Sequence, residues 1–194
     1  MADEAKQVKH YVKHKLLKLA GTRNESATRS MLANLRRGIG ETPGSVPALW
    51  DITLNGLPDH LCGTDTSPSK AEWCVHTALT LYALHQQGKE FKHQPMNQEG
   101  ASLGKSLRRL INSEDDEKRV KRRFDAAATS DSLEEFSHHL RGLVQLLKNQ
   151  NIPLDYPALA EDLYWFQNPD QRDLVRLGWG RDFYRISSKT ESEN

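Results

Sequence analysis

The sequence lacks the features that mark several large classes of protein. Cysteine occurs only at Cys62 and Cys74, which is too few for a disulfide framework in a chain of 194 residues. No apolar run approaches the roughly 18 residues that a membrane-spanning helix needs. The lysine-rich segment 1–18 is amphipathic and does not resemble a signal peptide. These absences favour a soluble protein of a reducing compartment, and we expect a cytoplasmic location without membrane contact.

Recognisable catalytic motifs are also missing. The sequence contains no P-loop, no G-x-S-x-G and no H-E-x-x-H. His10 and His14 share a helical turn and could bind a metal, but a zinc site needs at least a third ligand. Adjacent carboxylates such as Glu161 and Asp162 point in different directions from a helix, so we interpret them as solvated surface. We therefore predict no enzymatic activity, no metal and no cofactor.

What the sequence does have is helical periodicity, without a convincing alternating strand. The clearest helix covers residues 131–149, where apolar residues recur with a period of seven and form a stripe that includes Leu133, Phe136 and Leu140. Ser69 and Glu72 have the spacing of a capping box, and Asn168 followed by Pro169 suits the start of a last helix. Further helices are expected at 3–19, 26–37, 69–87, 102–112, 157–166 and 169–186, with a short one after Pro47. Another is expected to follow the acidic turn at 114–117 and to end at about residue 128.

The predicted fold class is all-α, with two small helical bundles packed together. Segment 88–101 has no periodicity, so we place the boundary there, between an N-terminal helical lobe at 1–92 and a C-terminal bundle at 93–194. The tail from about residue 187 is polar and is expected to be disordered. Apolar residues make up only 37% of the chain, below the roughly 45% of typical globular proteins, which indicates a modest core. Cys74, Trp165 and Trp179 are expected to belong to it.

Charge is distributed unevenly although the net charge is only +1. Residues 1–40 carry nine basic and three acidic residues, whereas 41–100 carry three and seven. Helical angles place the basic residues of three segments away from the apolar ones. The densest group lies at 118–123, with five basic residues in six positions. These faces suit the phosphate backbone of a nucleic acid, because guanidinium groups bind phosphate bidentately and counterion release drives association. The alternative is a charged face that is simply solvated.

The segments that carry these residues resemble the CasB family, the small subunit of the type I-E CRISPR surveillance complex Cascade. The resemblance extends from about residue 10 to residue 185 and depends on six motifs in the order and spacing of the family. The motifs are MLANLRRGIGETP at 31–43, ASLGKSLRRL at 101–110, RVKRRF at 119–124, LRGLVQLL at 140–147, LDYPALAEDLYWF at 154–166 and WGRDFY at 179–184.

The resemblance implies a non-catalytic protein that occurs as a pair within Cascade. Its partners would be crRNA and target DNA, including the displaced strand of the R-loop, other Cascade subunits and a second copy of itself. The basic positions that match are Arg29, Arg36, Arg37, Lys105, Arg108, Arg109, Arg119, Lys121, Arg122, Arg123 and Arg141. His138 and His139 precede the last of these and would interrupt a basic strip near neutral pH.

Two other hypotheses stay open at this point. The chain could be a stand-alone helical RNA- or DNA-binding protein that reads no sequence. It could also be a metal-dependent hydrolase that uses His10 and His14 with acidic partners. Copurification with a Cascade backbone subunit separates the first hypothesis from the Cascade role, and the metal content of the purified protein tests the second.

Overall fold

The computed structural model describes residues 2–22, 24–64, 66–91 and 93–185. Helices and turns dominate this part of the chain, and its only β-type pairings are two isolated bridges. The helices are α1 (Ala2–Gly21), α2 (Glu25–Arg37), the 3-10 turn η1 (Pro47–Leu49), α3 (Trp50–Thr53), the 3-10 turn η2 (Asp59–Leu61), α4 (Lys70–His85), α5 (Leu103–Arg108), α6 (Glu114–Ala128), α7 (Leu133–Asn149), α8 (Tyr156–Phe166) and α9 (Pro169–Tyr184). The all-helical prediction is confirmed.

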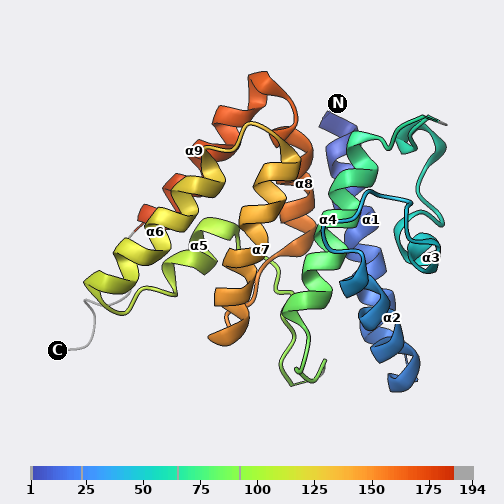
Figure 1. Ribbon diagram of the computed structural model, residues 1–194, viewed down its shortest axis with the longest axis horizontal. Helices are drawn as coiled ribbons and strands as arrows, with labels where there is room; N and C mark the ends of the chain where they lie inside the picture. Colours follow the sequence, from blue (N-terminus) through green and yellow to red (C-terminus); the bar gives the residue numbers. More distant parts are fainter. Residues whose placement is uncertain (1, 23, 65, 92, 186–194) are drawn as a thin grey trace.

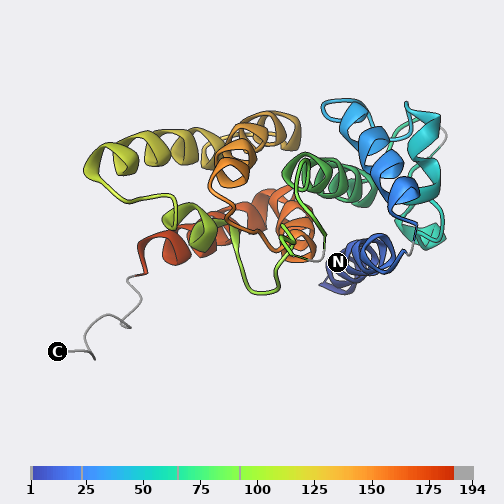
Figure 2. The ribbon, with the colours of Figure 1, turned by 90° about the horizontal axis from the view of Figure 1, so that it is seen from below.

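The helices form an elongated body of two layers. Figure 2 shows α6, α7, α4 and α2 along one side of the molecule and α9, α8 and α1 along the other. Short α5 packs on α9, and α3 lies beside α4 at the opposite end of the body from α6 (Figure 1). None of the described helices is long and apolar enough to cross a membrane.

Helix α4 lies at the centre, because it contacts α1, α2, α7 and α8. Its start follows from the predicted capping box: Ser69 Oγ accepts from Glu72 N at 3.0 Å, and Glu72 Oε2 accepts from Ser69 N at 2.6 Å. Thirteen of its sixteen residues are buried, so the helix is covered on all sides. A helix buried on all sides is a core helix whatever its amphipathicity.

The N-terminal and C-terminal parts of the chain share one continuous hydrophobic cluster. Helix α8 packs on both α1 and α4, across the boundary expected at residue 92. Segment 88–101 is irregular, as predicted, and it is also packed: Met96 is 3% exposed, and its backbone N–H donates to Gln86 Oε1 at 2.9 Å. The division into lobes at 1–92 and 93–194 stays a prediction, and the tail from about residue 187 lies outside the described residues.

Helix α5 is shorter than the predicted helix at 102–112, since it ends at Arg108. Beyond it, Leu110 and Ile111 form turns, and the Ser113 hydroxyl accepts from Asp116 N at 3.2 Å to begin α6. The last residues of the predicted helix therefore form the connection to α6 instead. Where α5 crosses α9, a Cβ on Gly104 would lie 2.2 Å from the Trp179 carbonyl oxygen, so only glycine allows this approach.

Candidate nucleic-acid interface

Helix α2 carries the first three predicted binding residues. Asn24 caps the helix, and its side chain accepts from Ala27 N at 3.1 Å. Because Leu32 and Leu35 point into the core, Arg29 and Arg37 are exposed and Arg36 is half-buried. Arg29 forms an exposed ion pair with Glu25 at 3.2 Å, which adds little stability. The predicted separation of basic and apolar residues on this helix is thus confirmed.

Helices α5 and α6 show the same separation. In α5, Leu103 and Leu107 are buried while Lys105, Arg108 and the following Arg109 are exposed. In α6, Val120, Phe124 and Ala127 face the core, and the cationic side lies opposite. Arg108 lies 3.9 Å from Glu117, so an ion pair connects the two helices.

The cations of α6 fall into two groups. Arg119 pairs with Asp116 at 2.7 Å, and Lys121 pairs with Asp125 at 2.5 Å. Within the described part of the chain, Lys118, Arg122 and Arg123 have no acidic side chain within 4 Å. Four acidic residues occupy the first turn, where they stabilise the positive end of the helix dipole. The exposed side of α6 therefore offers guanidinium groups that are free to bind an anion.

Arg141 is exposed on α7, one turn after the imidazole pair of His138 and His139, whose rings lie 5.7 Å apart. Helices α2, α6 and α7 belong to the same layer (Figure 2), and eight of the eleven predicted residues lie on these three helices. Lys105, Arg108 and Arg109 come from α5 and the turn after it, beside α9. Helices α2 and α6 thus share a layer but lie toward opposite ends of the elongated body (Figure 1), and the binding roles of their residues stay predictions.

Two lysines near Arg36 were not among the binding residues predicted from the sequence. Lys89 follows α4, and Lys148 lies in the last turn of α7. Burial lowers the pKa of the Lys148 ammonium, and the nearby charges of Arg36 and Lys89 lower it further. Because these three cations lie on separate segments, no local pattern in the sequence could have grouped them.

The chemistry set aside at the sequence level needs one correction. Asp162 is not solvated surface, because it lies against α9 and accepts a hydrogen bond of 2.6 Å from Trp179 Nε1. Burial raises the pKa of its carboxyl group to about 6. Glu161, next to it, pairs with Lys9 at 2.7 Å. Among the described residues, no group of three His, Cys, Asp or Glu side chains is placed to hold a metal ion.

Other predictions for the core are mostly confirmed. Cys74 is fully buried, and burial raises the pKa of its thiol. Trp179 is 2% exposed and stacks on Phe136, with ring centroids 5.0 Å apart and an interplanar angle of 14°. Trp165, by contrast, is only half-buried, and its ring lies edge-on to that of Tyr164.

The chain is thus an all-helical protein of two layers, and most of the predicted basic residues lie on helices of one layer (Figure 2). A search of family models matches residues 31–184 to the family described as CRISPR-associated protein Cse2. No curated protein gives a match. Among solved structures, CasB from Thermobifida fusca is 32% identical with a TM-score of 0.76, covering 92% of this chain and 98% of that one. CasB from Thermus thermophilus is 22% identical with a TM-score of 0.66, covering 93% and 97%, and shares the fold.

The fold and the family match lead to the same class, a helical CRISPR-associated protein. The chain belongs to the Cse2 family, whose solved members carry the name CasB. The resemblance that the sequence motifs indicated is thereby confirmed, and membership of this family supports a role as a Cascade subunit.

Proposed function

We propose that this chain is a non-catalytic small subunit of a type I-E CRISPR Cascade complex, where it binds nucleic-acid backbones and stabilises the crRNA-guided R-loop. Its partners in this role are crRNA, target DNA with its displaced strand, other Cascade subunits and a second copy of the chain. The proposal combines the family membership with the exposed basic helices of one layer.

One observation carries the proposal: Arg122 and Arg123 are exposed on α6 and have no acidic partner among the described residues. Arginines in this state bind phosphate oxygens bidentately and release condensed counterions without reading the base sequence. Such contacts suit an R-loop, which exchanges one duplex for another of similar stability and so can be tipped by modest backbone binding. This role needs no catalytic group.

The direct test is charge reversal in the double variant Arg122→Glu/Arg123→Glu. We expect weaker binding to all nucleic-acid sequences alike and a shallower dependence of log K on log salt, by about 2, because each lost phosphate contact removes about 0.9 from the slope. Lys6→Glu/Lys18→Glu changes the net charge equally at two exposed positions of α1, in the other layer, and serves as the control. An unchanged slope in the α6 variant would remove this surface from the interface.

Copurification tests the assembly. If the proposal is right, a tagged Cascade backbone subunit retains this chain through purification in high salt and after nuclease treatment. A stand-alone nucleic-acid-binding protein would instead be lost when the nucleic acid is digested. Absence of the chain from the intact complex would therefore contradict the Cascade role while leaving nucleic-acid binding intact.

A further inference from the structure

A cleft of about 700 Å³ lies between α2 and the segment that follows α4. Arg29 and Arg36 line it from α2, and Lys89 and Phe91 line it from the other wall. It adjoins a smaller cleft of about 290 Å³ along α1, because Ala20 and Phe91 line both. We call the larger one the α2 cleft and the smaller one the α1 cleft.

Cations from three separate segments lie in or beside the α2 cleft: Arg36 and Lys89 line it, and Lys148 lies next to its lining. Lys148 Nζ, at the end of α7, donates to Gln87 Oε1 at 2.9 Å, and Gln87 lines the cleft. Lys89 Nζ donates to the Asn151 side-chain oxygen. Both lysines are therefore held in place by neutral amides. Within the described residues, neither they nor Arg36 have a carboxylate within 4 Å, so their positive charge is not compensated.

The three cations repel one another, because the charges of Arg36 and Lys89 both lower the pKa of Lys148. Helix dipoles offset part of it, because Arg36 and Lys148 lie in the last turns of α2 and α7. Lys89 has no such support, four residues beyond the end of α4. The two carboxylates that line the cleft lie near other basic side chains of the same lining: Glu25 pairs with Arg29, and Glu90 lies 3.8 Å from His93. A bound anion would relieve the repulsion among the three cations.

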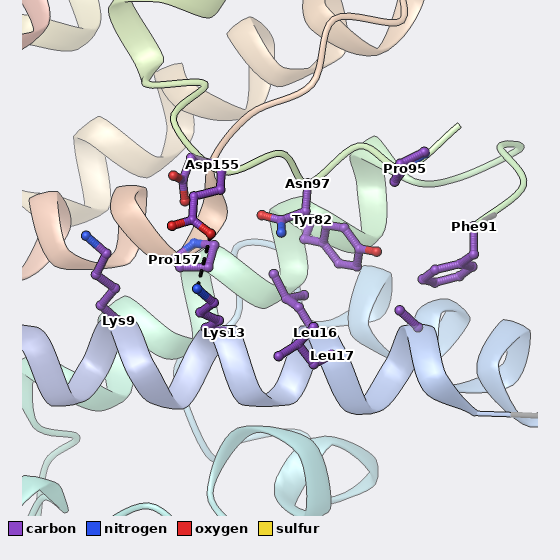
Figure 3. A pocket seen from close by; sticks show the side chains of 12 residues that line it. Lys9, Lys13, Leu16, Leu17, Tyr82, Phe91, Pro95, Asn97, Asp155 and Pro157 are labelled. Atoms are coloured by element: carbon purple, nitrogen blue, oxygen red, sulfur yellow. Dashed lines mark hydrogen bonds and ion pairs between the residues drawn. The ribbon is translucent and has the colours of Figure 1, made fainter. Parts of the chain in front are cut away.

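The α1 cleft differs in charge. Its lysines are compensated, because Lys9 pairs with Glu161 at 2.7 Å and Lys13 pairs with Glu99 at 3.2 Å. Figure 3 shows Lys9 and Lys13 toward one end of this cleft and Phe91 at the other, beyond Tyr82. The cations without a carboxylate partner therefore lie on the side of the α2 cleft, not in the α1 cleft.

Phe91 adds an aromatic surface next to the cations. Its ring is half-buried and packs edge-on against Tyr82, with centroids 6.4 Å apart and an interplanar angle of 64°. This contact supports the ring from one side. Aromatic rings beside cationic grooves are the usual platform for the bases of single strands, whereas the bases of a duplex are already stacked on each other.

We propose that the α2 cleft binds a single-stranded segment of nucleic acid, with phosphates on Arg36, Lys89 and Lys148 and a base against Phe91. This inference rests on the proposed function and extends it, because it adds residues from segments outside the basic helix faces. It also assigns a preference for single strands, which exposed arginines on a helix surface do not provide.

The test measures binding of the full chain to a fluorescent single-stranded oligonucleotide and to its duplex form. Phe91→Leu should weaken single-strand binding about five-fold or more, the effect of losing one stacked base, and leave duplex binding unchanged.

Lys89→Gln/Lys148→Gln should reduce the salt dependence of single-strand binding. Lys6→Gln/Lys18→Gln removes the same charge from α1 and should have little effect. Phe91→Tyr should retain binding, and thermal unfolding of each variant verifies the fold.

Three outcomes would overturn the inference. If the cleft variants bind the single strand like wild type while Arg122→Glu/Arg123→Glu is impaired, the cleft is not a binding site and the proposed function stands. If inorganic phosphate binds in a manner that depends on Lys89 and Lys148, but single-strand affinity does not, the site takes free phosphate instead. A wild-type chain that binds neither oligonucleotide would contradict the proposed function as well.

Discussion

The indole Nε1 of Trp179 in α9 donates a hydrogen bond of 2.6 Å to Oδ2 of Asp162 in α8. The same indole ring stacks on Phe136 and Phe166, so this contact anchors α9 to the ring cluster beneath it. The carboxyl group is consequently buried, and burial outweighs the hydrogen bond in setting its pKa to about 6, above the ordinary 3.8. The contact between these two helices is therefore sensitive to pH.

Asp162→Asn should make the chain more stable at neutral pH. The raised pKa means that folding favours the protonated acid, so this stabilisation is present below about pH 4 and is lost as pH rises through 6. Asparagine keeps an acceptor for Trp179 without the charge. We expect a free energy of unfolding higher than wild type by about 2 kcal/mol at pH 7 and similar to it at pH 4, measured by chemical denaturation. An equal difference at both pH values would contradict this account.

Gly104→Ala should destabilise the chain, because its methyl group would meet the backbone of α9 at Trp179 and Phe183. Backbone atoms cannot move aside as a side chain does, so we expect a loss of about 2–3 kcal/mol in the free energy of unfolding. Gly142→Ala is the matched control within α7. A Cβ there meets nothing within 4 Å, and alanine should stabilise the helix by about 1 kcal/mol. Equal effects would mean that α5 and α9 are not so closely packed.

Lys15→Met should destabilise the chain although it removes a buried charge. Lys15 is 6% exposed, and its ammonium group donates to the carbonyl oxygens of Asp51 at 3.0 Å and Asn55 at 2.7 Å, at the end of α3. Methionine leaves both carbonyls without this donor, at a cost of about 1–3 kcal/mol. Lys18→Met, at an exposed position of the same helix, should change the thermal stability little. A stable Lys15→Met variant would show that water replaces the ammonium group.

Local patterns predicted most of the fold. The capping box at Ser69, the cap at Asn168 and the stripe that begins at Leu133 each depend on residues within a few positions of one another, and the structure confirms all three. The burial of Lys15 and the partial burial of Asp162 could not be predicted, because their partners lie 36 and 17 residues away along the chain. Local periodicity contains no information about such distant contacts.

In the candidate interface, too, features set by the local sequence could be predicted and features set by tertiary packing could not. Exposure of the basic faces on α2, α5 and α6 could be predicted, since the angle between residues on one helix is fixed. The approach of Lys89 and Lys148 to Arg36 could not, because it depends on how α2, α7 and the segment after α4 are packed. As for Lys15 and Asp162, the information that was needed lies in the tertiary packing and not in the local sequence.

The cations of α6 should contribute unequally to nucleic-acid binding. Arg119 and Lys121 are engaged with Asp116 and Asp125, whereas Arg122 and Arg123 have no acidic partner among the described residues. A paired cation must leave its carboxylate before it contacts a phosphate, so it releases fewer counterions on binding. Arg122→Ala/Arg123→Ala should therefore reduce the salt slope by about 2, and Arg119→Ala/Lys121→Ala, with the same change in net charge, by clearly less. Fluorescence anisotropy across a salt series measures both slopes. Equal reductions would mean that α6 acts only through its net charge and that its ion pairs do not select which residues bind.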